Sequence, residues 1–183
     1  MFTNNYLRYK KAAFMGKDSF TYIDVSGASK ISYRNNKFSY NSEDIGGWMN
    51  KGKNSPPATT VATSGGVYFG SGSTPATKND YTLEAPIESG VLTITSPAEV
   101  KAVDGGNGRY TFISDFIVRN DSDTEVNIWE IGLFSLATTS ANSETHYLSL
   151  MERTVLTEPI TIPAGESRLV TYKLTFNQTL SVD

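Results

Sequence analysis

The chain has 183 residues, with 16 basic and 19 acidic side chains and a net charge of −3, and this length suits one domain with a sizeable core. It contains no Cys and a single His. These counts exclude disulfide scaffolds, thiolate zinc sites, cysteine nucleophiles and any site that needs two imidazoles.

The first residues predict a short helix. Asn4 or Asn5 can cap its start, apolar side chains recur along one side, and Gly16 stands where such a helix would end. Short strand patterns then follow at residues 20–25, 31–33 and 37–40. From residue 45 to 66 the chain is rich in Gly, Pro, Ser and Thr and has no period, which is typical of a functional loop or one held by a partner.

The rest of the chain consists of short apolar runs separated by turn residues. Hairpin turns are expected at residues 104–108 and 120–125. In the run at 110–118 one face is apolar, and Ile113 and Ile117 make the opposite face partly apolar too, which indicates either a central position in a sandwich or a subunit interface. The expected strands are 67–70, 91–95, 100–103, 110–119, 126–135, 147–156, 160–162 and 169–176.

This pattern predicts a mainly β fold, an antiparallel β-sandwich of jelly-roll or immunoglobulin-like type with a short N-terminal helix. Residues 1–66 would form an N-terminal arm with short strands and an irregular loop. Residues 67–183 would form the sandwich core of the same compact unit.

Charge is unevenly distributed along the chain. Residues 1–53 hold nine basic and four acidic residues, a balance of +5, whereas residues 54–183 hold seven and fifteen, a balance of −8. This is either ordinary surface scatter or a basic N-terminal face that docks on an acidic neighbour, such as a second copy. The second interpretation predicts these interface residues: Tyr6, Arg8, Lys10, Lys11, Trp48, Lys51 and Lys53.

Membrane and nucleic-acid partners are not expected. No apolar run approaches the roughly 20 residues that cross a bilayer, and the N-terminal segment lacks the apolar core of a signal peptide. The sequence pI of about 5.2 gives no long-range attraction to phosphate. We therefore expect a protein made in the cytoplasm without export.

Several motifs imitate chemical sites without completing them. Residues 47–53 match the start of the phosphate-binding motif GxxxxGK-Ser/Thr, but Asn54 stands where the motif has the Ser or Thr whose hydroxyl binds magnesium. Residues 121–125 begin like a calcium loop, but Val126 stands where the sharp turn needs Gly, so a hairpin turn or a weak incidental cation site is expected. His146 could act only as a lone general base. We therefore expect no catalytic residues, cofactor or metal.

Three stretches together resemble structural proteins of tailed bacteriophages. The first is a G-x-G-x-T-P tract at residues 70–75, followed by Asp80-Tyr-Thr-Leu83. The second runs from Ile117-Val-Arg-Asn-Asp-Ser to Glu130-Ile-Gly-Leu-Phe134. The third is Leu150-Met-Glu-Arg153, which leads to residues 159–166 and the alternating strand at 169–176.

The resemblance implies a non-enzymatic, β-sandwich subunit located in the virion, where it mediates assembly in the tail, neck or baseplate or attaches a fibre. Its partners would be copies of itself and other virion proteins. A capsid decoration protein is an alternative. A carbohydrate- or receptor-binding module that recognises a host-surface glycan is another, because Tyr68, Tyr81 and Trp129 could stack on sugars.

Overall fold

A computed structural model describes residues 1–14, 19–33, 49, 51–54, 57, 65–96, 99–138 and 146–177. One helix and nine strands follow in the order α1 (Asn4–Phe14), β1 (Ser19–Ile23), β2 (Ser29–Tyr33), β3 (Gly66–Gly70), β4 (Leu92–Thr95), β5 (Lys101–Asp104), β6 (Arg109–Asn120), β7 (Val126–Thr138), β8 (His146–Ile162) and β9 (Ser167–Asn177). The predicted mainly β, sandwich-like fold with a short N-terminal helix is confirmed. The strand expected at 37–40 lies outside the described residues.

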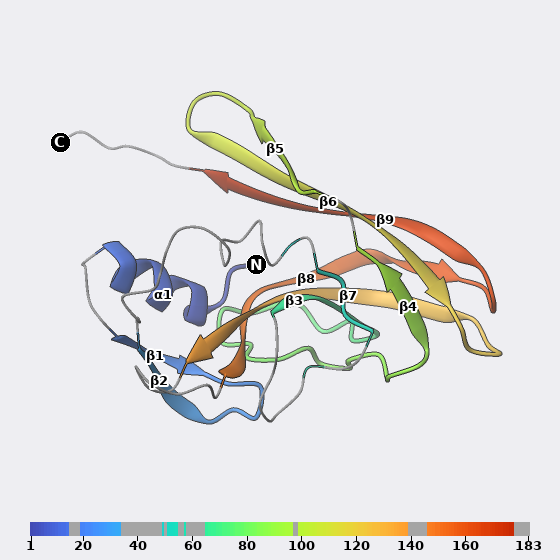
Figure 1. Ribbon diagram of the computed structural model, residues 1–183, viewed down its shortest axis with the longest axis horizontal. Coiled ribbons are helices and arrows are strands. Elements are labelled where there is room, and N and C mark those ends of the chain that lie inside the picture. The colour runs from blue at the N-terminus through green and yellow to red at the C-terminus, as the bar shows by residue number, and fades with distance from the viewer. Residues whose placement is uncertain are drawn as a thin grey trace.

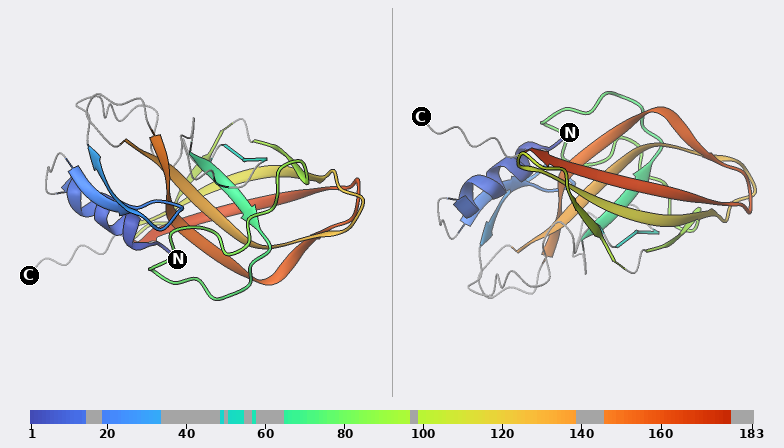
Figure 2. Two further views of the ribbon diagram at one scale, coloured as in Figure 1. Left: turned by 90° about the horizontal axis from the view of Figure 1, so that it is seen from below. Right: turned by 90° about the horizontal axis from the view of Figure 1, so that it is seen from above.

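Two antiparallel sheets form the sandwich. One sheet has the order β3–β7–β8. In the other, β9 pairs with β6 along residues 109–119, so β4 and β5 must share the opposite edge of β6. The hairpin β1–β2 forms a third, small sheet beside α1 (Figures 1 and 2). The 110–118 run thus lies in β6, the central strand of its sheet, but its outward residue Ile117 is 51% exposed, so a subunit interface on that face remains a prediction.

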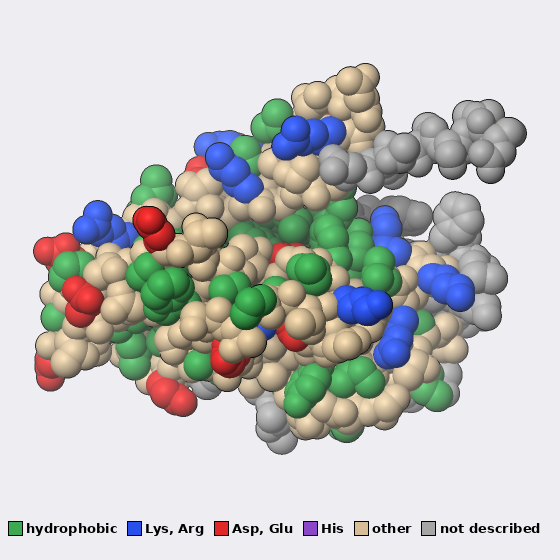
Figure 3. Space-filling model, turned by 180° about the vertical axis from the view of Figure 1, so that it is seen from behind, with side chains coloured by type: hydrophobic (Ala, Val, Ile, Leu, Met, Phe, Trp, Pro, Cys, Tyr) green, Lys and Arg blue, Asp and Glu red, His purple; other side chains and the backbone are tan. Residues whose placement is uncertain are grey.

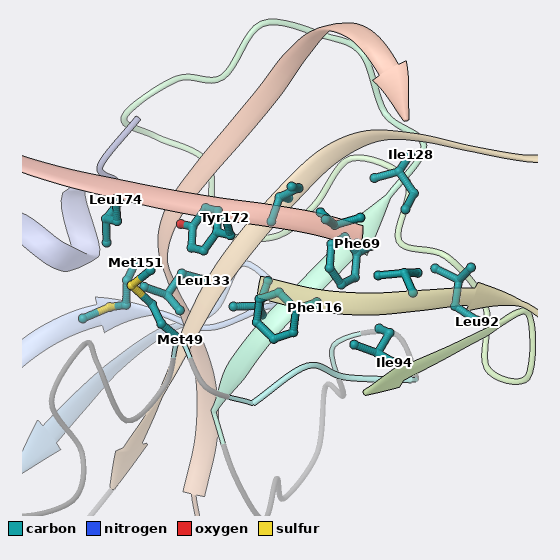
Figure 4. Close-up of a cluster of buried hydrophobic side chains, with 14 of the residues drawn as sticks. Met49, Phe69, Leu92, Ile94, Phe116, Ile128, Leu133, Met151, Tyr172 and Leu174 are labelled. Atoms are coloured by element: carbon teal, nitrogen blue, oxygen red, sulfur yellow. The ribbon is translucent and has the colours of Figure 1, made fainter. Parts of the chain in front are cut away.

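The main core fills the space between the two larger sheets. Inward-facing side chains of β3, β4, β6, β7, β8 and β9 converge there, and Met49 joins them (Figure 4). Tyr6 of α1 belongs to the same cluster. The alternation of β9 is as expected from its sequence, since Val170, Tyr172 and Leu174 are buried while the residues between them are exposed.

A second, smaller core lies on the other side of the β3–β7–β8 sheet. It contains Tyr68 and Phe134, whose rings meet edge to face at 4.9 Å, together with Leu83 from the loop between β3 and β4. This sheet is thus covered on both faces, which explains why all five residues of β3 are buried.

The predicted hairpin turn at 104–108 is confirmed, since it joins the paired strands β5 and β6. The prediction of a second hairpin at 120–125 was wrong: this turn joins β6 to β7, which belong to different sheets. In the turn at 104–108, Gly106, Asn107 and Gly108 all have positive φ, a conformation that Gly and Asn adopt more readily than other residues. The expected strands at 147–156 and 160–162 are one strand, β8, whose register against β7 shifts between Ile128 and Glu130. The break seen in the sequence therefore marks an irregularity within a strand and not a loop.

Candidate functional site

A buried arginine organises an ion-pair network beside the β3–β7–β8 sheet. Arg153 of β8 donates from Nε to Glu130 Oε2 at 2.7 Å, from Nη1 to Asp80 Oδ2 at 2.8 Å and from Nη2 to Glu84 Oε2 at 3.3 Å. The Arg153 side chain is 4% exposed and that of Glu130, on β7, is fully buried. Since Asp80 and Glu84 belong to the β3–β4 loop, the network ties this loop to the sheet.

The loop backbone also closes around Glu130. Its Oε1 accepts hydrogen bonds from the amides of Ala85 at 2.8 Å and Gly72 at 3.3 Å, and its Oε2 accepts one from the amide of Glu84 at 3.1 Å. A carboxylate that leaves water needs such partners, because an unpaired buried charge is strongly destabilising.

Neighbouring groups shift the pKa values of the network toward the charged forms. Burial raises the pKa of Asp80, but hydrogen bonds from Thr77 and Arg153 outweigh it and hold that pKa below its ordinary value. Hydrogen bonds from Thr74 lower the pKa of Glu84. Burial lowers the pKa of Arg153, but its carboxylate partners outweigh this and raise it. These three groups therefore stay charged at neutral pH.

Three glycines have no side chain where the network and the loop pack, and this makes room for both. A Cβ on Gly72 would lie 2.7 Å from Glu130 Oε1, and a Cβ on Gly70 would also collide with this carboxylate. On the neighbouring part of β7, a Cβ on Gly132 would lie 2.7 Å from Leu83 Cδ2. The loop can reach the sheet only because these positions carry no side chain.

The network brings together residues from three stretches that lie far apart in the sequence. Residues 70–83 supply Asp80, residues 117–134 supply Glu130, and residues 150–153 supply Arg153. All three side-chain nitrogens of Arg153 already donate to carboxylates, so its charge is matched within the chain. A shallow depression of about 410 Å³ beside it is lined in part by Pro75 and Leu156, but the matched arginine offers little attraction to an anionic ligand.

These four charged residues were not singled out by sequence reasoning. The available signal was a Glu and an Arg within two strands that are otherwise largely apolar, at Glu130 and Arg153. Buried charges are rare unless they are paired, so opposite charges in two buried strands indicate a pair. The contribution of Asp80 and Glu84 depends on the path of the β3–β4 loop, and a loop has no periodic sequence pattern from which its path could be predicted.

The N-terminal residues add a short strand at the edge of β8. Phe2 forms an antiparallel bridge with Glu152, and the amide of Thr3 donates to the carbonyl of Met151 at 3.0 Å. The buried Glu152 carboxylate accepts hydrogen bonds from the Met1 ammonium group at 2.6 Å and from the Tyr172 hydroxyl. Burial and the charge of Glu152 raise the pKa of Tyr172 well above its ordinary value. The N-terminal segment is thus anchored in the sandwich.

The predicted interface residues of the helix divide into two groups. Tyr6 is 5% exposed and stacks on Phe2 with ring centroids 4.2 Å apart, and burial raises its pKa to about 12. Arg8, Lys10 and Lys11 are exposed. The exposed side of α1 therefore carries the three cations, whereas Tyr6 contributes to the core.

Two other predicted interface residues, Lys51 and Lys53, lie beside β3. The Lys53 amide donates to the carbonyl of Val67 at 3.0 Å, and the Val67 amide donates to the carbonyl of Lys51 at 2.7 Å. Lys51 is exposed and Lys53 is half-buried; burial and the nearby Lys51 charge lower the Lys53 pKa. Trp48 lies outside the described residues. The interface role of these residues remains a prediction.

The β4–β6–β9 sheet leaves apolar side chains exposed on its outer side. Ile117 of β6 and Leu169 of β9 are cross-strand partners that are 51% and 67% exposed. Among the described residues, no strand pairs with the other edge of the eleven-residue strand β9. The outward positions of this sheet, which we call the outer face, are Thr93, Thr95, Ile113, Asp115, Ile117, Arg119, Leu169, Thr171 and Lys173.

The aromatic residues proposed for sugar stacking differ in exposure. Tyr68 is buried in the second core, Trp129 is half-buried, and only Tyr81 of the three is exposed, at 40%. They lie on three elements, namely β3, β7 and the β3–β4 loop. Glycan binding remains a prediction.

The turn at 120–125 is organised by Asn120. Its buried side chain donates to the carbonyls of Thr124 at 2.7 Å and Ile162 at 2.9 Å and accepts from the amide of Ser122 at 2.9 Å. In the described part of the chain, no group of three or more His, Asp or Glu is placed to hold a metal ion. No described helix is long and apolar enough to span a membrane.

Comparisons with models of known protein families, with curated proteins and with solved structures found no significant match.

Proposed function

We propose that the protein is a non-enzymatic structural subunit of a tailed bacteriophage virion. It would mediate protein–protein assembly in the tail, neck or baseplate or attach a fibre, with capsid decoration as the alternative position. Its partners would be copies of itself and other virion proteins, and its location would be the virion.

The observation that carries this proposal is the exposed apolar pair Ile117–Leu169 on the outer face. Apolar side chains on a sheet face, next to a long edge strand, are typical of surfaces that other subunits cover. The buried Arg153 network supports the same interpretation, because its charged groups are used to fix a loop. A rigid subunit loses little conformational entropy when it assembles.

The first test is the location of the protein. An antibody raised against the chain should decorate purified particles of the phage that encodes it, as seen by electron microscopy. Labelling of the tail, neck or baseplate would support the leading position, and labelling over the capsid would support decoration. Absence of the protein from purified particles would contradict the structural role.

The second test addresses the outer face. The double variant Ile117→Asp/Leu169→Asp should lose incorporation into particles while it keeps its fold, because charges replace the apolar contact. Ile31→Asp is a matched control, since Ile31 is 50% exposed but lies on β2. Normal incorporation of the double variant would show that the outer face is not a contact surface.

A further inference from the structure

The two ends of the long axis of the molecule carry opposite charge. The helix α1 lies at one end, and the turns that join β6 to β7 and β8 to β9 lie at the other (Figure 1). On the side shown in Figure 3, Asp and Glu side chains gather toward the end with the turns, and a group of Lys and Arg side chains lies at the opposite end. The uneven charge distribution along the sequence thus corresponds to a basic end and an acidic end of the folded molecule.

The basic end is the exposed side of α1. We define it as Leu7, Arg8, Lys10 and Lys11, all of which are exposed; Leu7 is 52% exposed. The helix contains no acidic residue that would neutralise these cations. An exposed apolar side chain surrounded by charges is the usual arrangement of a contact centre with a polar rim.

The acidic end is built where three turns meet at Asn120. The amide of Asp121 donates to the carbonyl of Val91 at 2.9 Å, and the amide of Gly165 donates to the carbonyl of Asn120 at 2.9 Å. These hydrogen bonds fix the turns relative to one another. They bring together five exposed carboxylates with only two arginines, Arg119 and Arg168; the carboxylates belong to Glu88, Asp121, Asp123, Glu125 and Glu166.

We propose that copies of this chain associate head to tail, with the basic end of one copy on the acidic end of the next. This inference rests on the proposed structural role and deepens it by naming one contact. Like ends repel, so a two-fold contact through either end is disfavoured. A contact between different surfaces leaves one end of each kind free, and repetition closes into a ring or extends into a filament.

The test uses variants that reverse the charge of one end. Arg8→Glu/Lys11→Glu makes both ends acidic, and Asp123→Lys/Glu166→Lys makes both ends basic. None of these four side chains forms a hydrogen bond or ion pair with described residues, so both variants should fold, as checked by circular dichroism. Lys51→Glu/Lys101→Glu is the control, because it changes the net charge as much as the first variant does at two exposed lysines that belong to neither end.

Sedimentation velocity at about 50 mM salt, where charges are weakly screened, gives the readout. Wild type and the control should associate, and added salt should weaken them. Each end variant alone should associate at least tenfold more weakly, and an equimolar mixture of the two should recover association because their reversed ends are complementary. A mixture that stays monomeric would overturn the head-to-tail contact.

The outcome is separable from that of the proposed function. If both end variants associate as wild type does, the contact is wrong, although the protein can still be a virion subunit that assembles through the outer face. If the protein is absent from purified particles but the charge-swap mixture associates, the contact is supported and the virion role is wrong.

Discussion

The two large sheets of this sandwich differ in how their outer sides are covered. The β3–β7–β8 sheet is covered by the β3–β4 loop, which Arg153 and Glu130 hold in place. The outer face of the β4–β6–β9 sheet instead exposes Ile117 and Leu169. The chain thus supplies its own cover for one sheet, and we propose that neighbouring subunits cover the other.

The largest loss of stability is expected from removing the arginine that holds the β3–β4 loop on the β3–β7–β8 sheet. Arg153→Met leaves the fully buried Glu130 carboxylate without its cation and should lower the free energy of unfolding by about 3–5 kcal/mol in a urea titration. Arg119→Met is the matched control, because Arg119 is 58% exposed and its pair with Asp121 should contribute less than about 1 kcal/mol. Equal losses in the two variants would contradict the role of burial.

A smaller effect is expected where the loop touches the sheet. Gly132→Ala brings a methyl group within 2.7 Å of Leu83 Cδ2 and should cost about 1–3 kcal/mol of unfolding free energy, because the loop must move. In Gly105→Ala the nearest atom would be 3.3 Å away, so the change should stay within about 0.5 kcal/mol. Thermal unfolding of both variants measures this difference.

Acidic pH should destabilise the packing of the β3–β4 loop on the β3–β7–β8 sheet. The folded protein holds the Asp80 pKa below its ordinary value of 3.8, so the stabilisation from this charge is complete above 3.8 and is lost as the pH falls through the lower folded value. The hydrogen-exchange protection factors of the β3–β4 loop, which are corrected for the pH dependence of the intrinsic exchange rate, should therefore fall at acidic pH in the wild type. In Arg153→Met the Asp80 contribution should shrink, and an unchanged pH profile in that variant would contradict this linkage.

The smallest effect on stability is expected at the outer face. Leu169→Asp changes a side chain that is 67% exposed, so the free energy of unfolding of the isolated protein should change by no more than about 0.5 kcal/mol. A loss above 2 kcal/mol in chemical denaturation would mean that Leu169 stabilises the subunit itself, and the contrast between the two sheets would then disappear.

Much of the fold could be predicted because strands leave local signals. Alternation predicted the buried face of β9, and the turn residues located the 104–108 hairpin. They also located the turn at 120–125, but that turn connects the two sheets and is not a hairpin, because turn residues do not show whether the flanking strands pair. The pairing of β6 with β9 could not be deduced, because 46 residues separate the two strands and neither carries a local mark of its partner. The irregularity in β8 has the sequence pattern of a break between two strands, since a shift in register and a turn both interrupt periodicity.

The surface was less predictable than the core. The sequence indicated that Ile113 and Ile117 make a second apolar face, but exposure depends on what packs there. Tyr6 and Tyr68 illustrate the same limit, because an aromatic residue in a strand or helix has the same local pattern whether it anchors a partner or fills the core.

The most direct measurement of the central claim uses the absence of native cysteine. A single cysteine introduced by Leu169→Cys can be labelled with a thiol reagent in the free protein and in purified particles, with Ile31→Cys as the control. The account predicts that position 169 reacts rapidly in the free protein and is protected in the particles, while position 31 reacts at the same rate in both. Equal reactivity of position 169 in the free protein and in the particles would contradict the claim that neighbouring subunits cover the outer face.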